Sequence, residues 1–517
     1  MLQSPSRTGP EGPPRPFGAA PAPGPASPPT SPRWVREQDH ALLYGPFPSG
    51  ALARGISDPT LILSDDAEVR EQALARIRAS GATVVRIPVE WRYVLSPQAP
   101  APAEASSPSS PAYDFTPVDA AVRDTVAAGL TPLLVVTRAP AAAEAPDRWR
   151  YAYPGSWAPD PQAFGQFATA VARRYDGAFP DPLEPGRPLP RVRLYEAWNE
   201  PNLARYLGPQ WVAEDGRWIA FSPLVYRQLL NAFYAAVKAV DPGDVVIAGG
   251  LAPNGEPAGD GRMTPVRFLS SLLCLEGARA SCPDPPHFDV LSFHPLSFES
   301  PDRPAASSQD VAIPDIGKVT ALLARAERRG TALPRGHKPL WVTELNWESA
   351  PASPTGVPAA LQAQWVSRAL HRLWIAGVGL AEWQFLVDPY PGVQLATPTG
   401  GLVLVPRPAG LYSAGPGGQL ALAQPKPFLT GFRLPFDPLR VNAKAVRVWA
   451  LLERPGERAL LESQTRRGSW RALARLRADG AGVLNALVRA HGPLALRLRA
   501  GSLVSAVTRV GAGRSRL

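Results

Sequence analysis

Apolar strand-like runs alternate with amphipathic helical segments from about residue 51 onward. Short apolar runs bounded by turn residues predict buried strands, and apolar residues recurring every three or four positions predict helices. Strands are predicted at 52–57, 82–91, 131–136, 191–198, 244–249, 288–293, 339–345 and 379–385. Helices between them are predicted at 65–80, 117–129, 161–175, 223–240, 264–275, 314–329 and 358–376.

Eight strand–helix repeats with nearly continuous apolar strands are typical of a parallel sheet that is covered on both faces. Spread over about 390 residues, they fit a closed (β/α)8 barrel better than an open sheet. No GxGxxG motif follows the first strand, which disfavours a dinucleotide-binding fold. The predicted fold class is therefore α/β, with a (β/α)8 TIM barrel as the main domain.

The pattern changes after a stretch rich in Pro and Gly at 386–437. Short alternations of apolar and polar residues, separated by turn residues, predict a small all-β sandwich. The predicted strands lie at 443–453, 458–463, 469–478, 482–488, 494–500 and 502–510. We therefore divide the chain into a Pro-rich disordered tail at 1–33, a barrel domain at 34–440 and a β-sandwich domain at 441–517.

Composition narrows the possible partners. No apolar run in the 517 residues reaches the roughly 18 needed to cross a bilayer, so no membrane span is predicted. The formal charge of +10 comes from 54 basic and 44 acidic residues, and much of the excess is dispersed through predicted strands after residue 440. Nucleic-acid proteins gather such charge into a patch with interleaved aromatics. We predict no nucleic-acid partner and a monomer.

The only two cysteines, Cys274 and Cys282, stand close together before the sixth predicted strand. Two thiols cannot alone make a structural zinc site, which needs four ligands. They are either two buried thiols or a local disulfide, and the disulfide would imply an oxidising compartment. An extracellular or cell-surface location is therefore our hypothesis, although the N-terminal sequence has no apolar segment of the signal-peptide type.

Two glutamates stand at the ends of the fourth and seventh predicted strands. Glu200 lies in YEAWNEPN and Glu344 in WVTELNW, each beside Trp and Asn. The carboxyl ends of barrel strands form the active-site face, so both side chains are expected at the barrel mouth. Two carboxyl groups about 5–5.5 Å apart are the machinery of a retaining glycosidase, and a wider pair that of an inverting one.

These segments resemble the clan of (β/α)8 glycoside hydrolases that carries its acid/base on strand four and its nucleophile on strand seven, in particular bacterial, cellulase-like members of families 39 and 5. FDVLSFHP, EWQF and VRIPVEW resemble the strand-six, strand-eight and strand-two segments of the clan. The similarity runs from about residue 50 to about residue 440. It implies an enzyme, a retaining glycoside hydrolase that cleaves O-glycosidic bonds of an oligo- or polysaccharide without metal or organic cofactor.

The resemblance also implies roles for single residues. Glu200 would be the general acid/base, Glu344 the nucleophile, and Asn199 the hydrogen-bond partner of the substrate 2-hydroxyl. The other expected site residues are Arg86 beneath the nucleophile, His294 at the rim near Glu344, Trp383 as the floor of a sugar subsite, and Trp198 against the substrate. Many clan members carry Tyr near the strand-six histidine, whereas this chain has Leu296 after Pro295.

Plainer interpretations remain open for several of these residues. Arg86 could be a structural ion-pair partner, His294 a hydrogen-bonded barrel histidine and Trp383 core packing. The whole protein could be a non-catalytic carbohydrate-binding protein on the same fold, or a transglycosylase. Trp449 and Trp470 lie within predicted strands of the sandwich, so we expect that domain to be a structural companion of the barrel and not a separate sugar-binding module.

Overall fold

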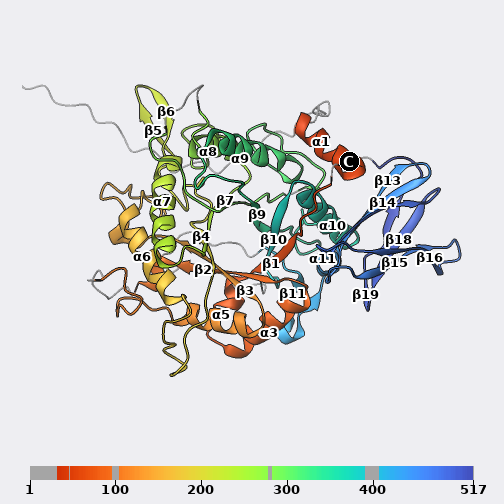
Figure 1. The fold of residues 1–517 in the computed structure, drawn as a ribbon, viewed down its shortest axis with the longest axis horizontal. Coiled ribbons are helices and arrows are strands. Elements are labelled where there is room, and N and C mark those ends of the chain that lie inside the picture. Colours follow the sequence, from red (N-terminus) through yellow and green to blue (C-terminus); the bar gives the residue numbers. More distant parts are fainter. Residues whose placement is uncertain are drawn as a thin grey trace, which may run out of the picture.

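The computed structural model describes residues 32–45, 47–95, 104–276, 282–297, 299–389 and 407–515. Eight parallel strands close into a barrel in the order β1-β10-β9-β8-β7-β4-β3-β2 (Figure 1). They are β1 (Ala53–Ser57), β2 (Val84–Glu90), β3 (Thr131–Thr137), β4 (Leu194–Ala197), β7 (Val245–Leu251), β8 (Val290–Phe293), β9 (Leu340–Leu345) and β10 (Val378–Gln384). The predicted barrel and each of its strands are confirmed.

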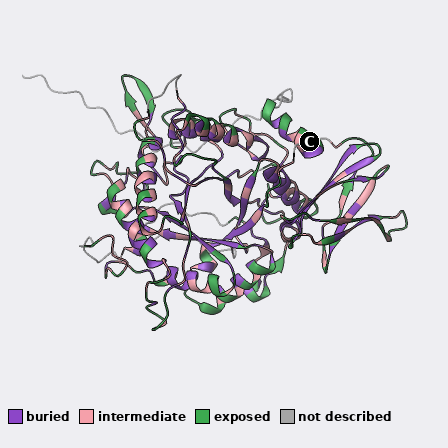
Figure 2. Ribbon diagram, viewed as in Figure 1, coloured by how far each residue is buried: buried purple, intermediate pink, exposed green. Residues whose placement is uncertain are grey.

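Helices surround the barrel and turn their apolar faces toward it (Figure 2). The seven predicted helices are confirmed within a few residues as α3 (Ala67–Ala79), α5 (Thr116–Ala127), α6 (Pro161–Arg174), α7 (Ser222–Val240), α8 (Pro265–Leu272), α9 (Gly317–Arg329) and α10 (Ala359–Ile375). Shorter helices are α2 (Pro59–Ile62), α4 (Trp91–Val94) and α11 (Pro427–Arg433). None of the helices in the described part of the chain is long and apolar enough to span a membrane.

Besides the three shorter helices, one longer helix was not predicted. α1 (Arg33–Tyr44) precedes the barrel and buries Leu42 and Leu43 against Leu439 and Val441. Its apolar partners lie almost 400 residues further along the chain, so nothing in the neighbouring sequence indicated that the segment would be ordered. Except for its last two residues, the tail predicted at 1–33 lies outside the described residues.

The C-terminal strands form two antiparallel sheets, which confirms the predicted sandwich. One sheet holds β13 (Phe436–Asn442), β14 (Ala445–Leu451) and β17 (Val483–Arg489), and the other β15 (Arg458–Gln464), β16 (Trp470–Arg477), β18 (Leu494–Ala500), β19 (Leu503–Val504) and β20 (Thr508–Val510). Sequence reasoning missed β13, an edge strand that contains Pro438, and the domain boundary predicted between residues 440 and 441 falls inside it. The run predicted at 502–510 divides into β19 and β20.

The three-stranded sheet is the one that contacts the barrel, beside α10 and α11 (Figure 1). The buried Trp449 stacks on His371 of α10 with a ring separation of 4.6 Å. Asp437 accepts hydrogen bonds from His371 and Arg368, and although burial alone would raise the pKa of Asp437, these partners hold it well below its usual value. The sandwich is thus packed on the barrel, as expected, with its five-stranded sheet outermost.

Cys274 and Cys282 form the predicted disulfide, in the segment between α8 and β8. The long segment after β4 contains a small hairpin of β5 (Trp211–Glu214) and β6 (Arg217–Ala220). Together with the other loops at the carboxyl ends of the strands, this segment surrounds the barrel mouth, where the two glutamates lie.

Candidate active site

The inside of the barrel changes from apolar to charged along its axis. Val84, Leu133, Val290 and Leu380 form a small apolar cluster with Ile247, separate from the main core. Side chains two positions apart on a strand share a face. The residues two positions further along the barrel strands therefore also point inward, closer to the mouth. This second group includes Arg86, Glu196, Ser292 and Glu382, all of which are buried.

The end of β4 is bent to hold Glu200 at the mouth. Trp198 and Glu200 both have left-handed backbone, with φ of 71° and 39°. A non-glycine residue in this region is strained by about 1–3 kcal/mol, and such strain is typical of active sites. The backbone is fixed there because Trp198 N–H donates to Val136 and Glu200 N–H donates to Gly250.

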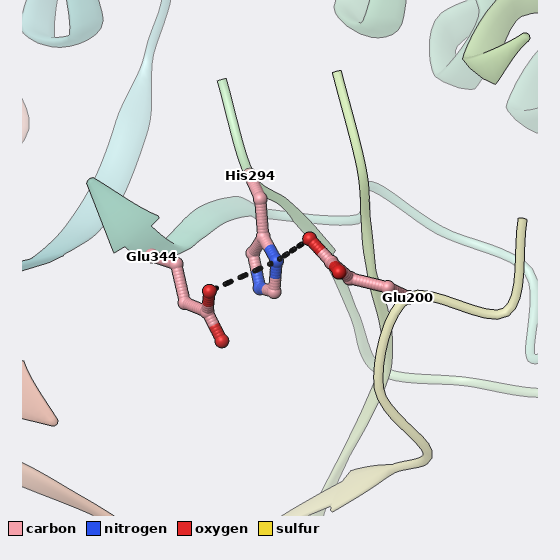
Figure 3. Close-up of side chains that lie close together, drawn as sticks. All are labelled: Glu200, His294 and Glu344. Carbon is pink, nitrogen blue, oxygen red and sulfur yellow. Dashed lines mark hydrogen bonds and ion pairs between the residues drawn. The ribbon is translucent and has the colours of Figure 1, made fainter. Parts of the chain in front are cut away.

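Glu200, His294 and Glu344 converge from the ends of β4, β8 and β9 (Figure 3). Nδ1 of His294 lies 3.2 Å from Oε1 of Glu200 and 3.7 Å from Oε2 of Glu344. A carboxylate oxygen of Glu200 and one of Glu344 lie within 4.8 Å of each other. Gly250 makes room for the imidazole, since a Cβ there would come within 2.5 Å of its Nε2.

Arg86 on β2 lies beside the glutamates at the strand ends and holds three site residues at once. Its guanidinium donates to Glu344 at 2.9 Å, to Glu196 at 2.6 Å and to Oδ1 of Asn199 at 2.8 Å. Burial opposes its charge, but the surrounding carboxylates more than compensate and raise the pKa of Arg86. The structure thus places Arg86 against the predicted nucleophile, and the ion-pair interpretation of this residue holds as well.

Sequence reasoning missed Glu196, which organises this network. It accepts hydrogen bonds from Arg86, from Ser292 at 2.7 Å and from Thr343 at 3.0 Å. The signal was available, because Glu196 is an acidic residue at an inward position of a strand whose neighbours are apolar. The hydroxyl of Thr343 donates to Glu196, so it accepts from Nε2–H of His294, 3.0 Å away.

That arrangement determines where protons can lie. With Nε2 of His294 donating, its Nδ1 faces Glu200, and this contact needs one proton on either the imidazole or the carboxyl. Burial opposes both charges, but the paired carboxylates raise the pKa of His294, while His294 and Arg205 lower that of Glu200. Both shifts favour the shared proton on His294 over Glu200.

Arg205 and Tyr206, which follow the WNEPN motif, complete the surroundings of Glu200. Neither was predicted as a site residue. Arg205 donates to Oε2 of Glu200 at 3.2 Å and to the hydroxyl of Tyr206 at 3.0 Å, and its side chain is 40% exposed. Burial, together with the charges of Glu200 and Glu344, raises the pKa of Tyr206 to about 12. Arg205 and Tyr206 therefore present donors at the mouth.

Glu382 is a further carboxyl that sequence reasoning missed. It lies on β10 directly opposite Gly55 of β1, is fully buried, and has no hydrogen-bond partner among the described residues. Burial raises the pKa of Glu382 well above its ordinary value; nearby Arg86 opposes the rise and Glu196 adds to it. Glu382 is therefore neutral, the cheaper state for a buried carboxyl.

The other predicted site residues, Asn199, Trp198 and Trp383, are all buried. Asn199 is nearly buried with its oxygen on Arg86, which leaves its amide N–H groups for a ligand. Trp198 is fully buried and donates to the carbonyl of Tyr206. Trp383 is also fully buried, donates to the carbonyl of Ala409 and packs on the ring of Phe428 in α11. The substrate roles of the two tryptophans stay predictions.

The three residues of Figure 3 are also of the types that bind metal ions. However, Arg86 already pairs with Glu344, and Arg205 with Glu200. A cation placed between these carboxylates would have to compete with both guanidinium groups. The arrangement fits acid–base chemistry between the two carboxyls better than it fits a metal centre.

Comparison with known proteins agrees with this fold. No protein-family model and no curated protein matches the chain. Among solved structures, a family 39 glycoside hydrolase from the gut symbiont Bacteroides cellulosilyticus WH2 superposes with a TM-score of 0.50 at 18% identity, over 85% of this chain and 81% of that one. The chain shares the fold of that glycoside hydrolase.

Two other solved structures are similar at lower scores. A glucosidase from Croceicoccus marinus has 14% identity and a TM-score of 0.49, over 86% of this chain and 94% of that one. A family 39 β-xylosidase from Caulobacter crescentus has 15% identity and a TM-score of 0.44, over 80% of this chain and 82% of that one.

Proposed function

We propose that the protein is a retaining glycoside hydrolase acting on O-glycosidic bonds of an oligo- or polysaccharide, with Glu344 as nucleophile and Glu200 as general acid/base. The observation that supports this most strongly is the approach of the two carboxylates to within 4.8 Å at the barrel mouth. A separation near 5 Å suits double displacement, whereas an inverting enzyme needs roughly 6.5–9.5 Å to admit a water molecule.

In the first step, an oxygen of Glu344 attacks the anomeric carbon and forms an ester while the bond to the leaving oxygen breaks. Arg86 and His294 keep the attacking carboxylate oriented. Glu200 protonates the leaving oxygen, and the proton comes from its contact with His294. A proton already held in that contact lets Glu200 act as an acid although its own pKa is low.

In the second step, Glu200 as a carboxylate takes a proton from water, the water oxygen attacks the anomeric carbon, and the ester to Glu344 breaks. Esterification removes the negative charge of Glu344, one of the charges that raise the pKa of His294. The proton of the His294–Glu200 contact left with the first product, and loss of this charge lowers the pKa of His294, so the imidazole competes less for the proton that Glu200 takes from water.

The test separates the two glutamates chemically. A 2-fluoro glycoside should inactivate the enzyme by labelling Glu344 alone, as read by peptide mass spectrometry. Glu200→Ala should lose about 10²–10⁴-fold on natural glycosides but far less on dinitrophenyl glycosides, whose leaving group needs no proton. Azide should rescue Glu200→Ala with net retention. A label on Glu200, or full activity in Glu344→Ala, would overturn the assignment.

Two alternatives remain for the same site. A non-catalytic binding protein would have no use for a buried arginine that orients one carboxylate beside another. A transglycosylase would use the same residues and pass the sugar to an acceptor other than water. Product analysis at high acceptor concentration separates transfer from hydrolysis.

We also propose that the protein works outside the cytoplasm. The disulfide between Cys274 and Cys282 supports this, because such bonds persist in oxidising compartments. Mass spectrometry of non-reduced peptides from the native source should find the two cysteines linked, and two free thiols there would contradict the proposal.

A further inference from the structure

The net charge of the chain lies in the sandwich. Residues 441–517 contain 15 of the 54 Lys and Arg residues but only 4 of the 44 Asp and Glu residues. Residues 1–440 contain the other 39 basic and 40 acidic residues, so they carry a net charge of −1 against +11 for the sandwich. A difference of this size gives one domain a positive field that acts over distance.

The outer face of the five-stranded sheet gathers this charge. Leu461 of β15 and Leu498 of β18 point into the sandwich core, so the residues between such positions point outward. The outward arginines are Arg458 on β15, Arg475 and Arg477 on β16, Arg497 and Arg499 on β18, and Arg509 on β20. We call these six residues the arginine face.

The arginine face has almost no acidic counterpart. Glu462 is its only carboxylate in the described part of the chain, and it pairs with Arg497 at 2.7 Å and Arg499 at 3.6 Å. Arg458, Arg475 and Arg509 have no acidic partner among the described residues.

Arg458 and Arg477 even stand directly opposite each other on neighbouring strands. Like charges in that position destabilise a sheet. The face therefore carries a repulsion that an external polyanion would relieve.

We propose that the arginine face binds an anionic polysaccharide, a chain that bears carboxylates along its length. This proposal departs from our expectation that the sandwich is only a structural companion of the barrel. The choice of a carbohydrate rests on the proposed function, and the charge complementarity comes from the face itself. Guanidinium forks bind carboxylates through two parallel hydrogen bonds. The surface is the exposed side of a sheet whose other side packs on the rest of the sandwich, so its backbone is firmly held.

Other polyanions fit the face less well. Single-stranded nucleic acids need open aromatic platforms for base stacking. The only aromatic ring on this face among the described residues, Trp470, is covered by the guanidinium of Arg497 at 4.1 Å. Membrane surfaces are bound by basic residues together with inserted apolar side chains. Among the described residues, the well-exposed large apolar side chains at this sheet are two valines, Val504 on β19 and Val507 directly before β20.

The experiment measures the binding of polygalacturonate by the full chain. Every variant tested also carries Glu344→Gln, so that no polymer is cut. Affinity electrophoresis at about 20 mM and about 300 mM salt should show tight retention that weakens with salt, because added ions screen exposed charges. The triple variant Arg458→Gln, Arg475→Gln, Arg509→Gln should bind about tenfold more weakly. The matched control Arg36→Gln, Arg328→Gln, Arg335→Gln removes the same charge from exposed positions outside the sandwich and should change binding less than about twofold.

Four results would overturn the proposal: no binding, equal losses in the two triple variants, equal binding of the fully methyl-esterified polymer, or tighter binding of DNA or of anionic vesicles at equal charge. Binding is scored without cleavage, so the two proposals fail separately. A chain that binds polygalacturonate but hydrolyses no glycoside refutes only the glycosidase. A chain that hydrolyses glycosides but does not bind polygalacturonate refutes only the proposal that the arginine face binds a polysaccharide.

Discussion

The barrel and the sandwich each contain a short arginine–glutamate pair, but they place it differently. Arg86 and Glu196 meet at 2.6 Å inside the barrel, with side chains 5% and 0% exposed. Arg497 and Glu462 meet at 2.7 Å on the sandwich surface, with side chains 19% and 11% exposed. The sandwich core itself is built from aliphatic residues together with Phe436.

Stability does not explain why the barrel buries charged side chains. Burying two charges removes them from water, and the attraction between them often does no more than offset that loss. A protein built only for stability would fill the barrel as the sandwich is filled. The charged layer therefore points to chemistry at the mouth, and the following experiments test that difference between the domains.

The largest difference in stability and activity between the two domains should appear when the arginine of each pair is removed. Arg86→Leu leaves Glu196 and Glu344 buried without their shared cation, which should destabilise the fold by about 3–5 kcal/mol and lower kcat by about 10²–10³-fold. Arg497→Leu should cost less than about 1 kcal/mol and leave kcat unchanged, because Glu462 retains Arg499. Urea unfolding and assays with aryl glycosides measure both.

Should Arg86→Leu fail to fold, Arg86→Lys keeps the charge but cannot reach three acceptors at once. It should fold and still show reduced kcat. Normal kcat in that variant would mean that the contacts of Arg86 to Glu344 and Asn199 do not matter for the reaction.

The reverse effect is expected from the sandwich core. Leu461 is fully buried among aliphatic side chains of both sheets. Leu461→Ala should lower the free energy of unfolding by about 2–5 kcal/mol, while kcat below the unfolding transition stays at the wild-type value. A fall in kcat would show that the sandwich influences the site, contrary to its role as a packed companion.

The sequence was sufficient for whatever depends on periodicity or on a local motif. The eight strands were recognisable from their apolar runs, and Glu200 and Glu344 from their place at strand ends. The network around them was not, since it joins Arg86 to residues 110 and 258 positions away, and such pairings are invisible to local patterns. Glu382 escaped notice because a buried neutral carboxyl looks like a solvated strand residue in the sequence.

A smaller effect is expected where β1 and β10 meet. A Cβ on Gly55 would lie 2.6 Å from Cγ of Glu382, so Gly55→Ala should cost about 1–3 kcal/mol through overpacking. In a Glu382→Ala background the clash is gone, and the two substitutions should be coupled by about 1–2 kcal/mol in a double-mutant cycle. Gly50→Ala, where a Cβ meets nothing within 4 Å, is the control. Additive losses would mean that Gly55 is required for another reason.

The last and smallest effect isolates the ionisation of Glu382. Its pKa is raised in the folded chain, chiefly by burial, and the unfolded value is about 4.3, so the native state binds this proton more tightly. Stability from this group is therefore complete below the unfolded pKa and declines as pH rises from there through the folded pKa.

Glu382→Gln keeps the shape but cannot ionise. The free energy of unfolding of Glu382→Gln should exceed that of the wild type by an amount that increases as the pH rises above about 4.3. Urea unfolding at several pH values measures this difference. Glu71→Gln, at an exposed position of α3, serves as the control. Wild-type and Glu382→Gln curves that stay parallel across the range would show that Glu382 titrates like a surface carboxyl. Glu382 would then be ionised inside the barrel although no described residue donates a hydrogen bond to it.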